Sequence, residues 1–314
     1  MTTHCPEISV TAPVGQAFDR AKRMLFQPFD IGKWFTVGFC AWLAYLGEKG
    51  GNFNFNPYSG SGGRPGPGQS PREVIDQAVH FVMQNLYWII PLAVALFLVS
   101  LALGMLLVWL SSRGKFMFLY CVALDRAEVK RPWSEFVREG NSLFWFQFVL
   151  GLLQMFLSLP LAVGMLFIVV RMIHRGRADQ GGILLAVGLG LALFALVVCY
   201  LLIRRFTLDF VVPIMFLRRM PCTVAWREFS GLLGAHAGHF TLYVLFQIVL
   251  SLVIGFLVLA AILVTCCTAC CLMILPYIGT VVLLPVLVFE RSYSLYYLAQ
   301  YGPAYDVFPA ELPG

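Results

Sequence analysis

The sequence predicts an all-α, polytopic membrane protein with six transmembrane helices arranged as three pseudo-repeats. Three observations lead to this fold class. Hydrophobic residues make up 60% of the 314 residues and charged residues only 12%, whereas soluble domains carry about 25% charged residues. A water-soluble fold of this length has too little polar surface to cover so many apolar side chains. Six segments are long and apolar, and amphipathic segments recur between them, so we expect lipid to surround most of the chain.

The repeat is clearest around residues 217–250. There the amphipathic segment V-A-W-R-E-F-S-G-L-L precedes the apolar run H-F-T-L-Y-V-L-F-Q-I-V-L. An earlier copy reads P-W-S-E-F-V-R-E-G followed by F-W-F-Q-F-V-L, and a fainter copy opens the chain. Each copy is an interfacial helix followed by a transmembrane hairpin, so successive copies keep the same orientation. We expect one integral membrane domain, residues 1–314, with repeat units at about residues 12–125, 126–219 and 220–301.

The first amphipathic helix is predicted at residues 13–25. Its apolar side chains share one helical face, and its charged side chains lie off that face. The apolar set is Val14, Ala17, Phe18, Ala21 and Leu25. A basic amphipathic helix directly before a span is typical of the membrane interface. We expect it to lie there, with an ordinary surface helix as the alternative.

Six apolar segments are the expected spans. They are residues 34–46, 87–110, 143–170, 183–203, 240–264 and 272–289. The first is short for a hydrocarbon core of about 30 Å, so we expect it to extend back toward Phe29 with Lys33 snorkelling to the interface. Apolar tails follow the second, fourth and sixth spans, and we expect them to lie in or near the interface. These tails are residues 115–124, 206–217 and 292–298.

Two segments have the composition of loops. Residues 47–70 are rich in Gly, Pro and Asn, which cannot bury a core, and are predicted to form a flexible extracytoplasmic loop. Residues 302–314 are proline-rich and are predicted to form a loose C-terminal tail. No cleavable signal peptide is predicted, because Met1–Thr11 has neither a basic nor an apolar region. Most of the 22 Lys and Arg fall on the side of the two termini, so the positive-inside rule places both termini in the cytoplasm.

The most conspicuous cluster of chemistry-bearing residues is a turn with four thiols. Its members are Cys266, Cys267, Cys270 and Cys271. Structural zinc sites usually join two separated ligand pairs, so we favour packing of small side chains here over a metal or redox site. The total of nine cysteines is odd and scattered, which does not indicate a disulfide framework.

Polar side chains inside the spans are few. Gln147, Gln154 and Gln247 are predicted to form hydrogen bonds between helices, with a polar path through the membrane as the alternative. Asp209 is the best candidate for an ionisable residue within the membrane. His236 and His239 share a helix face, but a metal site would need a further ligand such as Asp209 or Glu228.

Three motifs carry a family resemblance. They are A-F-D-R-A-K-R-M-L-F, F-V-V-P-I-M-F-L-R-R and V-A-W-R-E-F-S-G-L-L. In them the chain resembles uncharacterised prokaryotic six-span membrane proteins, which are similar to the membrane domain of some glycerophosphoryl diester phosphodiesterases. The resemblance implies a helical fold in the inner cell membrane. It covers most of the chain and transfers no active-site residue.

These patterns predict a non-enzymatic membrane component that organises lipid or partner proteins. None of the usual catalytic motifs is found, and no catalytic residue, cofactor or nucleic-acid partner is predicted. Anionic lipids on the cytoplasmic face are the expected partners, at about 1 kcal/mol per well-placed cation. The expected headgroup contacts are Arg20, Lys22, Arg23, Arg218, Arg219 and Arg227. One alternative is a transporter or pore lined by the three glutamines. Another is a lipid-modifying enzyme that uses Asp209, His236 and His239.

Overall fold

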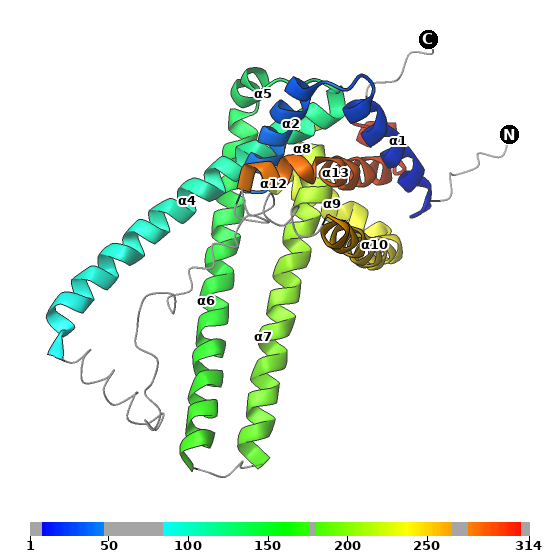
Figure 1. The fold of residues 1–314 in the computed structure, drawn as a ribbon. Helices are drawn as coiled ribbons and strands as arrows, with labels where there is room; N and C mark the ends of the chain where they lie inside the picture. Colours follow the sequence, from blue (N-terminus) through cyan, green and yellow to red (C-terminus); the bar gives the residue numbers. More distant parts are fainter. Residues whose placement is uncertain (1–7, 47–83, 176–179, 266–275, 309–314) are drawn as a thin grey trace. The chain divides into compact units, whose positions relative to one another are not determined.

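The computed structural model describes residues 8–46, 84–175, 180–265 and 276–308, and in these ranges every regular element is a helix. The prediction of an all-α fold is therefore confirmed. The elements are α1 (Ala12–Phe26), α2 (Ile31–Ala44), α4 (Leu86–Leu124), α5 (Lys130–Glu135), α6 (Val137–Arg175), α7 (Gln180–Phe206), the π-helical turn η2 (Thr207–Val211), α8 (Val212–Arg218), α9 (Cys222–Ala235), α10 (Ala237–Val264), α12 (Pro276–Val282), α13 (Leu284–Ala299) and the 3₁₀ turn η3 (Pro303–Tyr305) (Figure 1). The predicted loop at residues 47–70 and the cysteine turn lie outside the described residues.

The chain divides into two compact units, one of residues 46–108 and one of residues 1–45 with 109–314. The division falls within α4. In the smaller unit, the described residues are mainly the first part of α4, whose large apolar side chains are exposed. In the larger unit, α6 and α7 pack side by side (Figure 1). The polar sites described below all lie within the larger unit.

Within the described residues, four helices are long and apolar enough to cross a membrane. They are α4, α6, the continuous run from α7 through η2 to α8, and α10. They correspond to the second, third, fourth and fifth expected spans. Their apolar side chains point in all directions around the helix and remain largely exposed. A helix that is apolar all round needs an apolar environment. The prediction that the chain is embedded in a membrane is therefore confirmed.

The first and sixth expected spans have a different form. With 14 residues, α2 is about 21 Å long, which is shorter than the hydrocarbon core. The sixth segment is divided into α12 and α13 at Leu283, and Pro285 stands in the first turn of α13, where its missing N–H is tolerated. Helix α12 packs against α2, and the Tyr277 hydroxyl donates a hydrogen bond of 2.9 Å to the Phe35 carbonyl.

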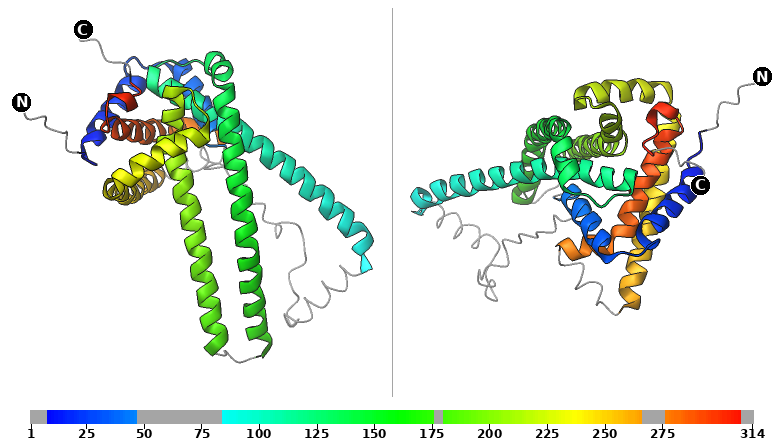
Figure 2. Two further views of the ribbon diagram at one scale, coloured as in Figure 1. Left: turned by 180° about the vertical axis from the view of Figure 1, so that it is seen from behind. Right: turned by 90° about the horizontal axis from the view of Figure 1, so that it is seen from above.

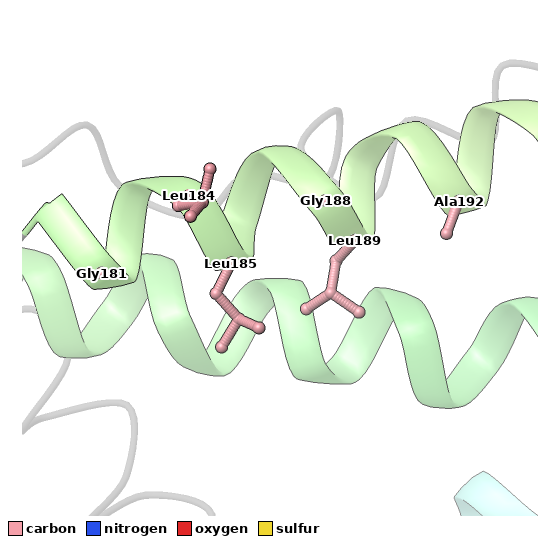
Figure 3. A pocket seen from close by; sticks show the side chains of 6 residues that line it. All are labelled: Gly181, Leu184, Leu185, Gly188, Leu189 and Ala192. Atoms are coloured by element: carbon pink, nitrogen blue, oxygen red, sulfur yellow. The ribbon is translucent and has the colours of Figure 1, made fainter.

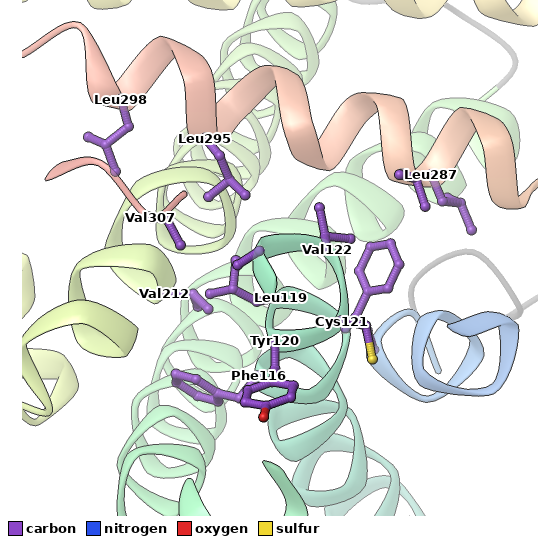
Figure 4. Packing of buried hydrophobic residues seen from close by; sticks show 14 of the residues in the cluster. Phe116, Leu119, Tyr120, Cys121, Val122, Val212, Leu287, Leu295, Leu298 and Val307 are labelled. Carbon is purple, nitrogen blue, oxygen red and sulfur yellow. The ribbon is translucent and has the colours of Figure 1, made fainter. Parts of the chain in front are cut away.

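The three apolar tails, which were predicted to lie in or near the membrane interface, are buried in the protein core. Residues 116–123, 210–212 and 214–215 are buried, as are most residues of α13. Leu119 and Val122 from α4 lie among Val212, Leu295 and Val307 (Figure 4). An apolar run does not reveal whether lipid or protein will cover it, and here the three runs cover one another.

The predicted interfacial helices also pack on protein. In α1, Ala17, Ala21 and Leu25 are buried, and the helix lies along α13 (Figure 2). Phe18, which the sequence placed on the same stripe, is instead 62% exposed. In α9 the buried side chains are Cys222, Ala225 and Phe229, and this helix contacts η2. The apolar face of each of these two helices is therefore buried against the protein core.

The start of the predicted loose tail is held in place. Val307 is buried, and Phe308 stacks on Tyr296 with ring centroids 4.3 Å apart. Just before it, Gln300 exchanges two hydrogen bonds with the main chain of Ser9, of 2.8 and 3.0 Å. Proline-rich composition suggested a loose segment, but the aromatic side chains between the prolines anchor it. The last six residues lie outside the described ranges.

Candidate functional site

A closed ring of polar side chains joins α7 and η2 to α10. We call Arg205, Asp209, Tyr243 and Gln247 the polar ring. Arg205 Nε lies 2.7 Å from Asp209 Oδ2, and the Tyr243 hydroxyl donates to the same oxygen over 3.0 Å. Gln247 Nε2 donates to the Tyr243 hydroxyl over 3.0 Å, and Arg205 Nη2 donates to Gln247 Oε1 over 2.9 Å. Each member therefore has two partners within the ring.

The helical spacing of the ring explains how it forms. Arg205 and Asp209 are four residues apart on one helix, and Tyr243 and Gln247 are four apart on another, so each pair shares a helix face. Asp209, Tyr243 and Gln247 are at most 6% exposed. Burial of such groups is tolerated only when they are hydrogen-bonded. The ring meets this condition and fixes α10 against η2.

A fifth polar residue reaches the same region from α13. Arg291 is 3% exposed, and its Nη1 donates to the Leu208 carbonyl over 2.6 Å. That carbonyl has no donor within its own helix. The Val212 N–H bonds to the Thr207 carbonyl in the π-helical pattern, and the next residue, Pro213, has no N–H. Arg291 supplies the missing donor.

In this arrangement, burial disfavours the charged form of Arg291. Burial lowers the pKa of Arg291 below its ordinary value, and the nearby Asp209 opposes that effect. Nη2 of Arg291 and Oγ of Ser292 are buried without a hydrogen-bond partner among the described residues. The cluster thus holds two guanidinium groups and one carboxylate in an apolar surrounding. Its contacts have a structural role, because they join neighbouring helices.

The three glutamines have separate environments. Gln247 belongs to the polar ring. Gln147 on α6 accepts a hydrogen bond of 3.3 Å from the Ser112 hydroxyl on α4. Gln154 is partly buried. The two hydrogen-bonded glutamines each join different pairs of helices, as expected for polar groups inside a bundle.

Arg20, Arg218 and Arg219 are predicted headgroup contacts that are engaged within the protein. Arg20 Nη2 donates to the carbonyls of Val122 and Ala123 over 3.1 and 3.0 Å, which satisfies orphan carbonyls at the end of α4. Arg218 pairs with Glu228 at 2.8 Å. Arg219 contacts the Glu135 carboxylate, and its Cζ lies 3.8 Å from the centroid of the Phe136 ring. These three cations hold helix ends and connections together.

The other predicted headgroup contacts have exposed side chains: Lys22, Arg23 and Arg227. On α1, Lys22 lies between Phe18 and Phe26, which are 62% and 49% exposed. Residues spaced by four share one helix face, so α1 presents a Phe-Lys-Phe face to its surroundings while its opposite face packs on α13. We call this surface the outer face of α1.

Among the described residues, the remaining candidates do not gather into a metal site. The rings of His236 and His239 have centroids 5.9 Å apart, and His236 lies 5.5 Å from Tyr301. Within the described residues no three His, Cys, Asp or Glu side chains gather closely enough to hold a metal ion. The thiols of Cys266, Cys267, Cys270 and Cys271 lie outside those residues.

An apolar pocket of 370 Å³ opens on α7 beside α6 (Figure 3). Its lining is made only of glycine and aliphatic residues: Gly181, Leu184, Leu185, Gly188, Leu189 and Ala192. No lining side chain can donate or accept a hydrogen bond. The pocket therefore has the chemistry of the lipid-facing surface around it.

Comparison with known proteins assigns a family. Residues 8–275 match a family of unknown function, DUF7544. The chain belongs to this family. No curated protein and no solved structure gives a significant match.

In this DUF7544 chain, sequence reasoning found part of the polar cluster and missed the rest. Asp209 and Gln247 stood out as polar residues within apolar segments. Arg205 was interpreted as the end of a span, and Arg291 was not singled out. The spacing of Arg205 to Asp209, and of Tyr243 to Gln247, carries a usable signal, because both pairs are four residues apart. The link between the pairs depends on tertiary packing.

Proposed function

We propose that this chain is a non-enzymatic membrane component that binds anionic lipid headgroups at its cytoplasmic face. The observation that carries the proposal is the outer face of α1, where two exposed phenylalanines flank Lys22. Exposed aromatic rings beside a cation suit the boundary between acyl chains and headgroups. Phe29 and Ile31, which are 60% and 61% exposed, extend this apolar surface beyond the helix.

The outward cations supply the charge. Lys22 and Arg23 lie on α1, and Arg227 lies on α9. Each cation near an anionic membrane contributes about 1 kcal/mol. Arg20, Arg218 and Arg219 act as internal braces in this proposal, because their guanidinium groups already contact carbonyls, carboxylates or rings. The proposed lipid-binding set is the exposed cations Lys22, Arg23 and Arg227.

The proposal includes a pseudo-threefold architecture with six membrane segments, in which α2 and the α12 region form a short outer pair. Two equivalent features support the repeats. Asp125 and Arg219 each follow a buried tail with a positive φ, of 54° and 53°. Phe136 stacks on Phe116 at 5.6 Å, and Phe229 stacks on Phe210 at 5.2 Å.

The location and topology are part of the same proposal. Both termini are cytoplasmic, by the positive-inside rule. The prokaryotic inner membrane follows from the resemblance to membrane domains of glycerophosphoryl diester phosphodiesterases. In this topology the outer face of α1 lies against the cytoplasmic leaflet, where anionic lipids are concentrated.

The alternatives fit the geometry less well. A pore needs polar side chains free to contact a solute, yet both ends of the Gln247 amide are hydrogen-bonded. A lipid-modifying enzyme that used Asp209 as a base would need a free carboxylate. That carboxylate is paired with Arg205 and accepts a hydrogen bond from Tyr243.

A lipid titration tests the proposal. The full chain in neutral detergent is titrated with fluorescent phosphatidylglycerol, with phosphatidylcholine as the reference. Reversing three charges, with Lys22→Glu, Arg23→Glu and Arg227→Glu, removes about 3 kcal/mol of attraction, so we expect roughly a hundredfold loss of affinity for the anionic lipid. Arg171→Glu, at the far end of α6, is the control and leaves the affinity unchanged. Equal affinity of the triple variant and the wild type would refute lipid binding by this surface.

A further inference from the structure

We infer that Cys40 and Cys121 form a thiol pair that accepts a disulfide, which would join α2 covalently to the buried end of α4. The Cys121 thiol lies 3.8 Å from the sulfur of Cys40. Both residues are fully buried, and 81 positions separate them in the sequence. Cys121 points toward α2 (Figure 4). This site is independent of the proposed lipid-binding surface.

Contacts on both sides of the sulfur pair hold the two helices in antiparallel register. On one side, the Ser111 hydroxyl donates to the Ala44 carbonyl over 2.7 Å. On the other side, Lys33 Nζ lies 2.9 Å from Asp125 Oδ1. The two sulfurs are therefore brought together by fixed backbones.

The helices also approach closely near the pair. A Cβ built on Gly114 would lie 2.5 Å from the Leu43 carbonyl carbon and the Ala44 nitrogen. Only a residue without a side chain permits this approach. A disulfide needs a sulfur–sulfur distance of about 2.05 Å, so the sulfurs must move closer by roughly 2 Å. A single side-chain torsion, χ1, sets the position of each sulfur relative to its backbone. Rotation about χ1 can move a sulfur by about this distance.

The apolar surroundings of the two thiols favour a neutral oxidant. Both thiols lie in the apolar core, which disfavours entry of charged reagents. Neutral two-electron oxidants with an azo or quinone group partition into such surroundings. In the reaction, the two S–H bonds break and one S–S bond forms. Two electrons and two protons pass to the oxidant, and an azo N=N bond becomes a hydrazine N–N bond with two new N–H bonds.

The other described cysteines provide matched controls. Cys222 is also buried and Cys199 is exposed, but among the described residues neither thiol contacts a second one. A reaction that depended only on burial would include Cys222, and one that depended only on exposure would select Cys199. Reaction of Cys40 with Cys121 alone among these four requires the contact between the two sulfurs.

The test treats membranes that contain the full chain with diamide, a neutral azo oxidant. The protein is then denatured, free thiols are blocked with N-ethylmaleimide, and peptides are mapped by mass spectrometry. We expect a reductant-sensitive peptide that links Cys40 to Cys121, and a reversible rise in the melting temperature. Cys121→Ser leaves Cys40 fully blocked by the maleimide. If wild-type Cys40 and Cys121 are both recovered as maleimide adducts after oxidation, the inference is wrong.

Discussion

Arg291 on α13 donates a hydrogen bond of 2.6 Å to the main-chain oxygen of Leu208 in η2. This contact joins the residue directly before the third apolar tail to the second tail. It depends on a local irregularity, because the π-helical turn and Pro213 together leave the Leu208 oxygen without a helical donor. A proline in the second tail thus leaves an acceptor that an arginine on α13 satisfies.

Replacement of Arg291 by leucine should destabilise the fold by about 3 kcal/mol. The substitution leaves the buried Leu208 oxygen unsatisfied and removes a hydrogen bond from a charged donor. Thermal unfolding of the detergent-solubilised chain measures the loss. The Pro213→Ala background provides the control, since its new N–H can bond to the Leu208 oxygen. There the same Arg291→Leu change should cost less, and equal costs in both backgrounds would contradict this account of the contact.

The hydroxyl of Tyr243 is the joint of the polar ring, because it donates to Asp209 and accepts from Gln247. We expect Tyr243→Phe to destabilise the chain by about 2 kcal/mol, since a buried carboxylate and a buried amide each lose a partner. The cost should fall when Gln247 is also changed to leucine. A double-mutant cycle on the melting data gives the coupling energy. Tyr87→Phe, at an exposed position, serves as the control, and additive effects at Tyr243 and Gln247 would argue against a connected ring.

The apolar tails show where sequence reasoning succeeds and where it stops. Residues 115–124 were predicted as a helical apolar segment, and they are one. Their place in the protein was not predictable, because an apolar run fits lipid and protein equally well. The same limit applies to α1. Most of its predicted apolar stripe is buried, and it packs on α13, but Phe18 was wrongly placed on the stripe and is exposed together with Phe26.

Polar contacts within one helix were more accessible to sequence reasoning than contacts between helices. The spacing of four residues predicts that Arg205 can reach Asp209. No local pattern predicts that Tyr243 and Gln247 complete the ring, or that Arg20 binds the carbonyls at the end of α4. These contacts depend on how the tails are brought together. The sequence alone could therefore not distinguish the cations that contact protein groups across helices from those with exposed side chains.

Two glycines on α4 should respond in opposite ways to alanine. At Gly114 a Cβ would lie 2.5 Å from the backbone of α2, which neither helix can relieve without moving. We expect Gly114→Ala to lower stability by at least about 3 kcal/mol through overpacking. At Gly104 nothing lies within 4 Å of a Cβ, so alanine should be neutral or stabilising by up to about 1 kcal/mol through helix propensity. The melting temperature of each variant, compared with that of the wild type, measures these effects. An unchanged melting temperature for Gly114→Ala would mean that α2 and α4 are not in backbone contact.

Stability at high pH should depend on Cys222, the first residue of α9. A helix N-terminus usually lowers a thiol pKa, but burial dominates here and raises the pKa of Cys222 to about 12, from an ordinary value of 9.0. Below pH 9 the thiol is protonated in both the folded and the unfolded chain, so it adds no pH dependence. Above pH 9 the unfolded chain releases the proton while the folded chain retains it. Stability is therefore lost as the pH rises from 9 toward 12, at roughly 1.4 kcal/mol per pH unit.

The Cys222→Ala variant isolates this effect from the buried tyrosines. Burial also raises the pKa of Tyr293, which adds a common alkaline loss of stability to both proteins. The cavity left by alanine lowers stability by the same amount at every pH. The wild-type advantage over Cys222→Ala should thus be constant up to pH 9 and shrink from there to pH 11, as measured by thermal unfolding in detergent. An advantage that stays constant across this range would show that the Cys222 thiol is not held protonated by the fold.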